Sequence, residues 1–399
     1  MESLKLSILR ALYFSPNQSI AELSNGIGKS IPLITKAVNE LLIAELVINC
    51  GLRASTGGRR AIHFMLNSDK QGCIIAVAMD QYTTHVSAVN LANEQLLPTK
   101  KITTHLWDNP DIYTQLIDTL TTLISEFPTD KILSIGITMP GFVDSEKGIN
   151  NSFPPQSPLY NLRDNIQSHF KIPTYLENDS AAIAIAEKNF GLIQEAPNAL
   201  VVNLNWGVGL GMIVDGKLFK GHSGFAGEFS HIPLANDDKL CSCGKKGCLE
   251  VAASLLCAIE YIVEAIQEGQ PSSLEATYNQ HQNISLEDVY EAYVRGDQVT
   301  IIAIRKIAYM LGKGIATLIH ILNPETIVIS GKAILFGDVL LPQIQSSIQE
   351  YCIPRLAKHT SIQISEIKNV QLLASTCIAV QQMQWNIHTK HKQLTKAKL

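Results

Sequence analysis

The chain has 399 residues, of which 46% are hydrophobic and 17% charged, with a net charge of −4. These values are ordinary for a soluble globular protein with two or three domains. The sequence contains no run of about 18 uncharged apolar residues, so no membrane span is predicted. The N-terminus lacks the apolar core of a signal peptide, so a cytoplasmic protein is expected.

The charge is unevenly distributed along the chain. Residues 1–66 hold seven Lys or Arg and four Asp or Glu, so this segment carries about +3 and the remainder about −7. A basic segment attached to an acidic body is typical of a head that binds a polyanion.

The pattern within this basic segment predicts a helix-turn-helix. Apolar residues recur at helical spacing over 4–13. Ser19 and Glu22 then form a capping box at the start of a short helix. A longer helix is expected to start at Ser30, with Pro32 in its first turn, where a missing N–H costs little. A short helix, a tight turn and a longer helix make up the helix-turn-helix arrangement.

Polar side chains at the start of the longer helix are suited to phosphates and base edges. Two strand-like runs then bracket the glycine- and arginine-rich stretch 51–60, which predicts a wing that lies along DNA or enters its minor groove. A small helical domain that binds proteins is the alternative. The residues expected to contact double-stranded operator DNA are Lys29, Ser30, Thr35, Lys36, Asn39, Arg53, Arg59 and Arg60.

From about residue 72 the pattern becomes that of an α/β body. Two α/β units facing each other would form a cleft, with functional groups at strand ends and loops. The predicted elements are a hairpin over 74–78 and 86–91, helices over 110–127 and 181–189, strands over 132–138, 199–205 and 326–330, and a long helical region over 251–322.

The stretch 241–250 carries the most specific pattern, three cysteines spaced C-x-C-x4-C with glycines between them. One upstream histidine would complete the tetrahedral shell that Zn²⁺ prefers, and no position is left for water, so a structural zinc is expected. The metal would hold Glu228 and Glu250 in one pocket. The alternative is a loop of small residues that happens to contain cysteines. The candidate ligands are His231, Cys241, Cys243 and Cys248. The remaining cysteines, expected to be small buried apolar residues, are Cys50, Cys73, Cys257, Cys352 and Cys377.

Four motifs follow one another along the body. In order they are Glu177-Asn-Asp179, Gly224-Phe-Ala-Gly-Glu-Phe-Ser-His231, Cys241-x-Cys-Gly-x-x-Gly-Cys-x-Glu250 and Asn323-Pro-Glu-Thr-Ile-Val-Ile-Ser-Gly331. Through these motifs the body resembles the ROK family of repressors, sugar kinases and uncharacterised reading frames over residues 72–385. The resemblance implies the actin-like, ribonuclease H-like fold shared with hexokinases and Hsp70, in which two βββαβα lobes bind a sugar between them. It also implies that the four residues of the cysteine cluster bind zinc.

The matching positions imply a sugar site. Carboxylates and an amide suit paired sugar hydroxyls, which both donate and accept hydrogen bonds. In the kinases, the residue at position 179 would be the general base that deprotonates the attacking hydroxyl. Its alternative role is to cap the following helix. The residues implied to bind a hexose or related sugar are Asn178, Asp179, Glu228, His231 and Glu250.

Both loops that would hold ATP phosphates depart from the kinase pattern. The first, Asp-x-Gly-Gly-Thr in kinases, is Asp80-Gln-Tyr-Thr-Thr84 here. The second, Gly-Thr-Gly-x-Gly-Gly, is Gly207-Val-Gly-Leu-Gly-Met212. Only glycine lets the main chain approach phosphates closely, so phosphoryl transfer is expected to be lost and no enzyme is predicted. An active ATP-dependent sugar kinase with an appended DNA-binding head is the alternative.

Together these patterns predict a sugar-sensing, DNA-binding transcriptional repressor of carbohydrate-utilisation genes. The effector would be a sugar or sugar phosphate, and paired heads on a palindromic operator imply a homodimer or dimer of dimers. A body that docks a protein partner is a third hypothesis. The predicted domains are a winged helix-turn-helix over 1–66, a first lobe over 67–190, a second lobe with the zinc loop over 191–375, and over 376–399 a C-terminal helix returning to the first lobe and a basic tail.

Overall fold

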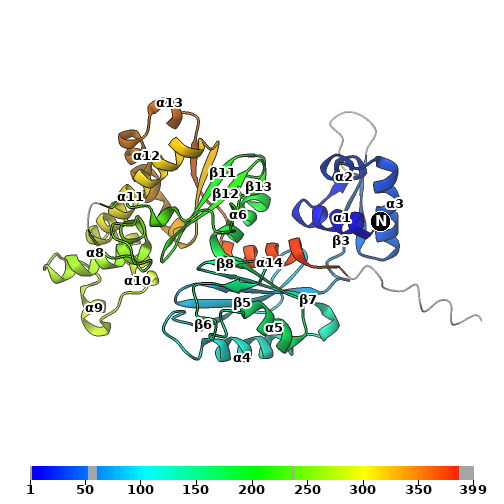
Figure 1. Cartoon of the computed structure of the whole chain (residues 1–399), viewed down its shortest axis with the longest axis horizontal. Helices are drawn as coiled ribbons and strands as arrows, with labels where there is room; N and C mark the ends of the chain where they lie inside the picture. The colour runs from blue at the N-terminus through cyan, green and yellow to red at the C-terminus, as the bar shows by residue number, and fades with distance from the viewer. Residues whose placement is uncertain (1, 53–60, 236–237, 386–399) are drawn as a thin grey trace, which may run out of the picture. The chain divides into compact units, whose positions relative to one another are not determined.

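The computed structural model describes residues 2–52, 61–235 and 238–385. The chain forms two compact units, the first made of Met1–Asp179 with Leu372–Leu399 and the second of Ser180–Gln371 (Figure 1). The limits given above for the four domains stay predictions. Among the described helices, none has the length and apolar character needed to cross a membrane.

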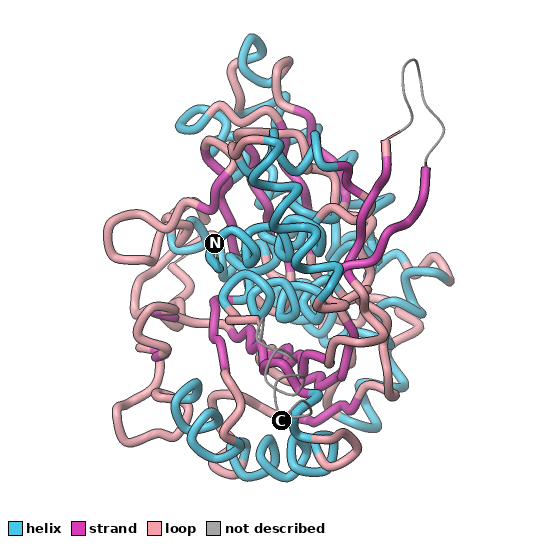
Figure 2. The backbone as a smooth tube through the Cα atoms, turned by 90° about the vertical axis from the view of Figure 1, so that its right-hand side faces the viewer, coloured by secondary structure: helices cyan, strands magenta, loops and turns pink. Residues whose placement is uncertain are grey.

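The N-terminal head of the first unit has the predicted helix order. Its capping box is confirmed, because Ser19 Oγ accepts from the Glu22 N–H at 3.3 Å and the Glu22 carboxylate accepts from the Ser19 N–H at 2.6 Å. The second and third strands form the hairpin that Figure 2 shows side by side. The elements are α1 (Glu2–Phe14), β1 (Gln18–Ser19), α2 (Ile20–Ile27), α3 (Ile31–Ile43), β2 (Val47–Leu52) and β3 (Ile62–Leu66), with the strands in the order β1-β3-β2.

The body of the first unit is a five-stranded sheet in the order β10-β7-β4-β5-β6. β4, β5 and β6 are antiparallel to one another, whereas β7 and β10 add to β4 in parallel. The elements are β4 (Cys73–Met79), β5 (Thr83–Asn90), β6 (Lys100–Thr103), α4 (Ile112–Ile124), η1 (Thr129–Lys131), β7 (Ile132–Met139), β8 (Val143–Asp144), β9 (Ile149–Asn150), α5 (Leu162–Phe170) and β10 (Thr174–Asn178).

Helices cover both faces of this sheet (Figure 1). Apolar side chains of α4 and α5 pack against one face in a single buried cluster. The C-terminal helix α14 (Val370–Gln382) packs so closely on the other face that a Cβ at Gly136 would lie 2.0 Å from the Ser375 carbonyl oxygen. The Ser375 hydroxyl also lies 2.8 Å from Thr138 Oγ1. Glycine at 136 therefore permits the close approach of α14.

The second unit repeats the same sheet topology in the order β13-β12-β11-β14-β15, with three antiparallel strands followed by two parallel ones. This repeat is the arrangement that the family resemblance implied. The elements are α6 (Asp179–Phe190), β11 (Ala199–Leu204), β12 (Val208–Val214), β13 (Lys217–Leu218), η2 (Phe229–His231), α7 (Glu250–Ala253), α8 (Leu255–Gln267), α9 (Glu275–His281), α10 (Leu286–Val294), α11 (Gln298–Leu322), β14 (Thr326–Ser330), η3 (Lys332–Phe336), α12 (Gly337–Tyr351), α13 (Pro354–Ala357) and β15 (Ser361–Ile364).

The cysteines outside the cluster divide into two groups. Cys73, Cys257, Cys352 and Cys377 are buried, as predicted, whereas Cys50 is exposed. The prediction was wrong for Cys50 because its strand, β2, lies at the edge of a small sheet that covers little of its surface.

A buried carboxyl group ties α6 to the second sheet. Glu187 accepts hydrogen bonds from Ser330 Oγ at 2.8 Å and from Ser365 Oγ. These serines stand at the end of β14 and just after β15. Burial raises the pKa of the Glu187 carboxyl above its ordinary value of 4.5, an effect that outweighs the two serine hydrogen bonds, which lower it. The folded protein therefore favours the neutral form of this side chain.

This burial predicts a pH-dependent term in stability. Because the folded pKa is raised, Glu187 should make the unfolding free energy fall as pH rises from the ordinary value of 4.5 to the folded pKa. The variant Glu187→Gln cannot ionise, so its unfolding free energy should lack this fall. Urea unfolding across that pH range measures the difference, with exposed Glu126→Gln as the control. An unchanged pH dependence in Glu187→Gln would contradict the assignment.

Candidate functional site

The cysteine loop of the second unit is held by short backbone hydrogen bonds. The Cys241 N–H donates to the Lys245 carbonyl at 2.8 Å, and the Gly244 N–H returns to the Cys241 carbonyl at 2.9 Å. Gly244 and Gly247 adopt positive φ angles of 81° and 70°, which favour glycine. These bonds close a tight loop that turns its thiols toward one point.

Four ligand atoms meet at this point, all within 4.8 Å of one another. Cys243 Sγ lies 3.6 Å from Cys248 Sγ, and Cys241 Sγ lies 3.6 Å from His231 Nδ1. In a tetrahedral site with typical zinc bond lengths, two sulfurs stand about 3.8 Å apart and a sulfur and a nitrogen about 3.6 Å apart. The donor set and its spacing therefore fit a tetrahedral metal ion, and the predicted ligands are brought together.

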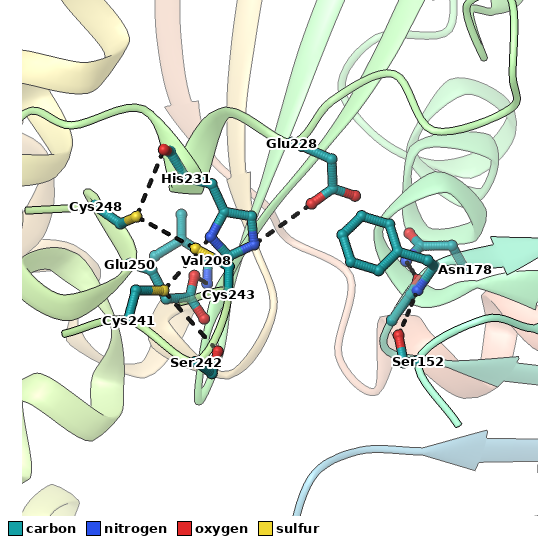
Figure 3. A network of polar contacts seen from close by, with 12 residues as sticks. Ser152, Asn178, Val208, Glu228, His231, Cys241, Ser242, Cys243, Cys248 and Glu250 are labelled. Carbon is teal, nitrogen blue, oxygen red and sulfur yellow. Dashed lines mark hydrogen bonds and ion pairs between the residues drawn. The ribbon is translucent and has the colours of Figure 1, made fainter. Parts of the chain in front are cut away.

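The two ring nitrogens of His231 face different groups (Figure 3). Nδ1 faces the thiol of Cys241, while Nε2 lies 3.6 Å from a carboxylate oxygen of Glu228. A carboxylate on the outer nitrogen of a metal-binding histidine fixes the orientation of the ring. One residue can thus serve both predicted roles, as a metal ligand through Nδ1 and as a neighbour of a polar ligand through Nε2.

Glu250 connects the cysteine loop to the turn between β11 and β12. Its carboxylate accepts the Val208 N–H at 3.0 Å (Figure 3). A Cβ at Gly207 would lie 2.5 Å from Glu250 Oε1, so only glycine allows this approach. Burial raises the pKa of the Glu250 carboxyl, although the Val208 N–H and nearby His231 lower it. Glu250 is therefore positioned by both segments.

The remaining predicted sugar residues lie in the first unit, at the carboxyl end of β10. Asn178 donates its amide to the Gly141 carbonyl at 3.0 Å. The facing loop is fixed by Ser152 Oγ, which accepts the Phe142 N–H at 2.9 Å. Asp179 is buried as the first residue of α6, where a negative charge interacts favourably with the helix dipole. The predicted helix-start position of Asp179 is compatible with a role in binding.

The loop between β4 and β5 uses its backbone donors internally. One oxygen of Asp80 accepts the N–H groups of Tyr82 and Thr83, both at 2.7 Å. The other oxygen accepts the Thr83 hydroxyl at 2.7 Å. A phosphate loop needs such N–H groups to point at its ligand. In this chain they point at Asp80.

The glycines of the second glycine-rich loop are also required by the packing of the fold. A Cβ at Gly209 would lie 1.9 Å from Ser180 Oγ, and one at Gly211 would lie 2.3 Å from Ala184 Cβ. Both glycines belong to β12, where they let α6 pack against the sheet. They are therefore explained by packing, without a phosphate.

In the head, the predicted DNA-contacting side chains of α3 and the residues just before it lie largely in solvent. Lys29, Ser30, Lys36 and Asn39 are exposed, and Thr35 is half-buried. The opposite face of α3 is buried in the head core. The three predicted wing residues Arg53, Arg59 and Arg60 lie outside the described residues.

The family model for the ROK family matches residues 76–373. The chain belongs to the ROK family. Among its curated relatives, a xylose repressor of Caldicellulosiruptor bescii is 29% identical over 383 residues, which cover 94% of each chain.

Two solved ROK structures extend the comparison. A ROK family transcriptional regulator, described as a homolog of E. coli MLC protein, has a TM-score of 0.76 at 28% identity and covers 94% of this chain and 95% of its own. A ROK glucokinase of Streptomyces griseus, solved with glucose and AMPPNP, has a TM-score of 0.67 at 25% identity and covers 77% of this chain and 98% of its own. The predicted fold class, a DNA-binding type of head on a two-lobed actin-like body, is confirmed.

Several residues support the loop beside Asn178 through contacts that the sequence did not predict. Ser152 and Gly141 fix the loop beside Asn178, and the 106° φ of Gly141 requires glycine. Asn150 is fully buried and donates to the Pro140 carbonyl at 2.9 Å, so it supports this loop from behind. A glycine next to Pro140 is a turn signal, but nothing near it in the sequence indicates its partners.

Proposed function

We propose that this ROK protein is a sugar-responsive transcriptional repressor of carbohydrate-utilisation genes, acting in the cytoplasm as a homodimer or dimer of dimers. The observation that carries the proposal is the extent of similarity to a xylose repressor, 94% of each chain, which includes the head. The glucokinase structure covers only 77% of this chain. Paired heads would read palindromic half-sites, as helix-turn-helix dimers do.

The head supplies the DNA-binding half of the proposal. Exposed Lys29 and Lys36 flank the start of α3, which carries no side-chain cap. Glu40, the acid on this helix, is paired with Lys5 at 2.6 Å. The face is therefore positively charged, as a surface that contacts phosphates should be.

Removing these lysines tests the DNA-binding half. In Lys29→Ala/Lys36→Ala, operator affinity should fall and the slope of log K against log salt should decrease by about two, because each lost phosphate contact contributes about 0.9. Anisotropy titrations at several salt concentrations measure both, on DNA selected from a random library. Exposed Lys358→Ala in the second unit is the control. An unchanged slope in the double variant would show that α3 does not face the phosphates.

The body supplies the sugar-binding half. Glu228, His231 and Glu250 gather around the cysteine loop in the second unit, and Asn178 and Asp179 end a strand in the first. We propose that these residues bind the sugar, since carboxylates and amides match paired hydroxyls. The ligand is a hexose, pentose or sugar phosphate.

Isosteric variants test these residues. Asp179→Asn and Glu228→Gln should each weaken sugar binding by about tenfold or more, because a hydrogen bond to a charged group contributes about 1.5–3 kcal/mol. Calorimetry with a panel of sugars measures the loss, and DNA affinity without sugar should stay unchanged. Exposed Asp118→Asn is the control. If both variants bind the sugar as the unmodified protein does, the site lies elsewhere.

We further propose that the metal is zinc, since three thiols and an imidazole at these spacings suit it. The ion would hold His231, and through it Glu228, in the orientation that the sugar requires. Its role is therefore structural.

Exposed cysteines provide a matched test of the metal. Cys243→Ser should lower zinc affinity by more than about tenfold and weaken sugar binding, while Cys50→Ser should change neither. Chelator competition with elemental analysis measures the zinc. Full zinc affinity in Cys243→Ser would contradict the ligand set.

Phosphoryl transfer is proposed to be lost. Supporting this, the Asp80 carboxylate occupies two backbone donors of the first loop, and Glu250 occupies the Val208 donor of the second. Because glucokinases are among the relatives, an active sugar kinase is the second candidate function. Coupled measurement of ADP release with the bound sugar separates the two functions.

The head is physically joined to the first lobe, which offers a route for the sugar signal. Tyr13 of α1 donates its hydroxyl to Asn93 at 2.5 Å, and Arg10 donates to the Met383 carbonyl, just after α14, at 3.1 Å. Tyr13 is buried, and burial raises the pKa of its phenol well above the ordinary value. A shift of α14 would therefore be transmitted to α1.

A further inference from the structure

The start of α3 exposes apolar side chains that the head does not need for its core. Ile31 is 54% exposed and Pro32 beside it is exposed. The later turns of the helix pack into the head core, where Ile34, Val38 and Leu41 are fully buried. Ile31 and Pro32 thus present an apolar surface to solvent at the first turn of the helix.

Thr35 extends this surface by one helical turn. Its hydroxyl donates to the Ile31 carbonyl at 2.8 Å, so its only donor is used inside the helix. Residues four apart lie above one another on a helix, which places the Thr35 side chain beside Ile31. The methyl group of Thr35 is the part of that side chain suited to a new contact.

The surroundings of this apolar surface suit a polyanion. Lys29 and Lys36 are exposed on either side of it. Ser30, the N-cap residue, makes no side-chain cap bond, so its hydroxyl is not used to start the helix. Helix N-termini and hydroxyls of this kind contact phosphates in protein–DNA complexes. Phosphate contacts made by these polar groups would therefore place the apolar surface next to the base edges.

We propose that Ile31, Pro32 and the Thr35 methyl group contact the 5-methyl group of thymine in the major groove of each operator half-site. This inference rests on the proposed DNA-binding function. Thymine alone among the four bases presents an apolar group in the major groove, and recognition helices read bases with their N-terminal residues. α3 has no arginine, the side chain most often used to read guanine.

The test removes the thymine methyl group without changing any hydrogen-bonding atom. The full-length protein first selects its binding sequence from a random duplex library. Each thymine of the selected half-site is then replaced in turn by deoxyuridine. At one or two positions, affinity should fall about fourfold, equivalent to about 0.8 kcal/mol for one buried methyl group.

Two isoleucines of the same helix provide the variant and its control. In Ile31→Ala, the deoxyuridine penalty should largely disappear while the salt dependence stays unchanged, because no phosphate contact is removed. Ile43 is 77% exposed at the far end of α3, and Ile43→Ala should keep the full penalty. This pattern would support methyl readout by Ile31.

The other outcomes each overturn a defined claim. A selected sequence that tolerates deoxyuridine at every position, or that lacks thymine in its half-sites, would overturn methyl readout and leave the DNA-binding function standing. A full penalty retained by Ile31→Ala would also overturn it. Failure to select any sequence would overturn both the inference and the proposed function.

Discussion

The hydrogen bond from the Val208 N–H to the half-buried Glu250 carboxylate is the contact on which the second unit's site depends. Glu250 directly follows the cysteine loop, and Val208 begins β12 at the turn from β11. The bond joins the cysteine cluster to the central sheet, and Gly207 leaves room for it. A metal ion that fixes the loop would therefore also fix Glu250, His231 and Glu228.

The same hydrogen bond helps to explain how a kinase-like body could sense a sugar without transferring phosphate. A glycine turn that donates its N–H to its own protein has one donor fewer for a phosphate. Asp80 takes two further donors in the equivalent loop of the first sheet. The proposed sugar site uses carboxylates, an amide and an imidazole, so losing the phosphate loops need not remove it. A ligand that binds two conformations unequally is then sufficient for regulation.

Features encoded by neighbouring residues were predictable from the sequence. The Ser19–Glu22 capping box, the strand Thr326–Ser330 and the cysteine cluster depend on short spacings, and the structure contains each of them. The helical region over 251–322 was predicted without its internal breaks, and it comprises α7 to α11.

Contacts between distant segments were not predictable. Glu187 looks like one more polar residue on an alanine-rich helix, because Ser330 and Ser365 lie far along the chain. Tyr13 likewise gives no sign of Asn93 as its partner. Asp80 kept the identity expected of a phosphate loop, yet its use as the centre of a closed turn depends on backbone directions that residue identity does not fix.

The central claim is that one sugar, bound by the body, changes DNA binding by the head. The most direct measurement is fluorescence anisotropy of a preformed complex with selected DNA, challenged by a panel of free and phosphorylated sugars. The account predicts that one sugar shifts DNA affinity by about fivefold or more, the usual lower range of coupling between sites, and that Glu228→Gln abolishes the shift. A sugar that binds the body tightly without changing DNA affinity would contradict the claim.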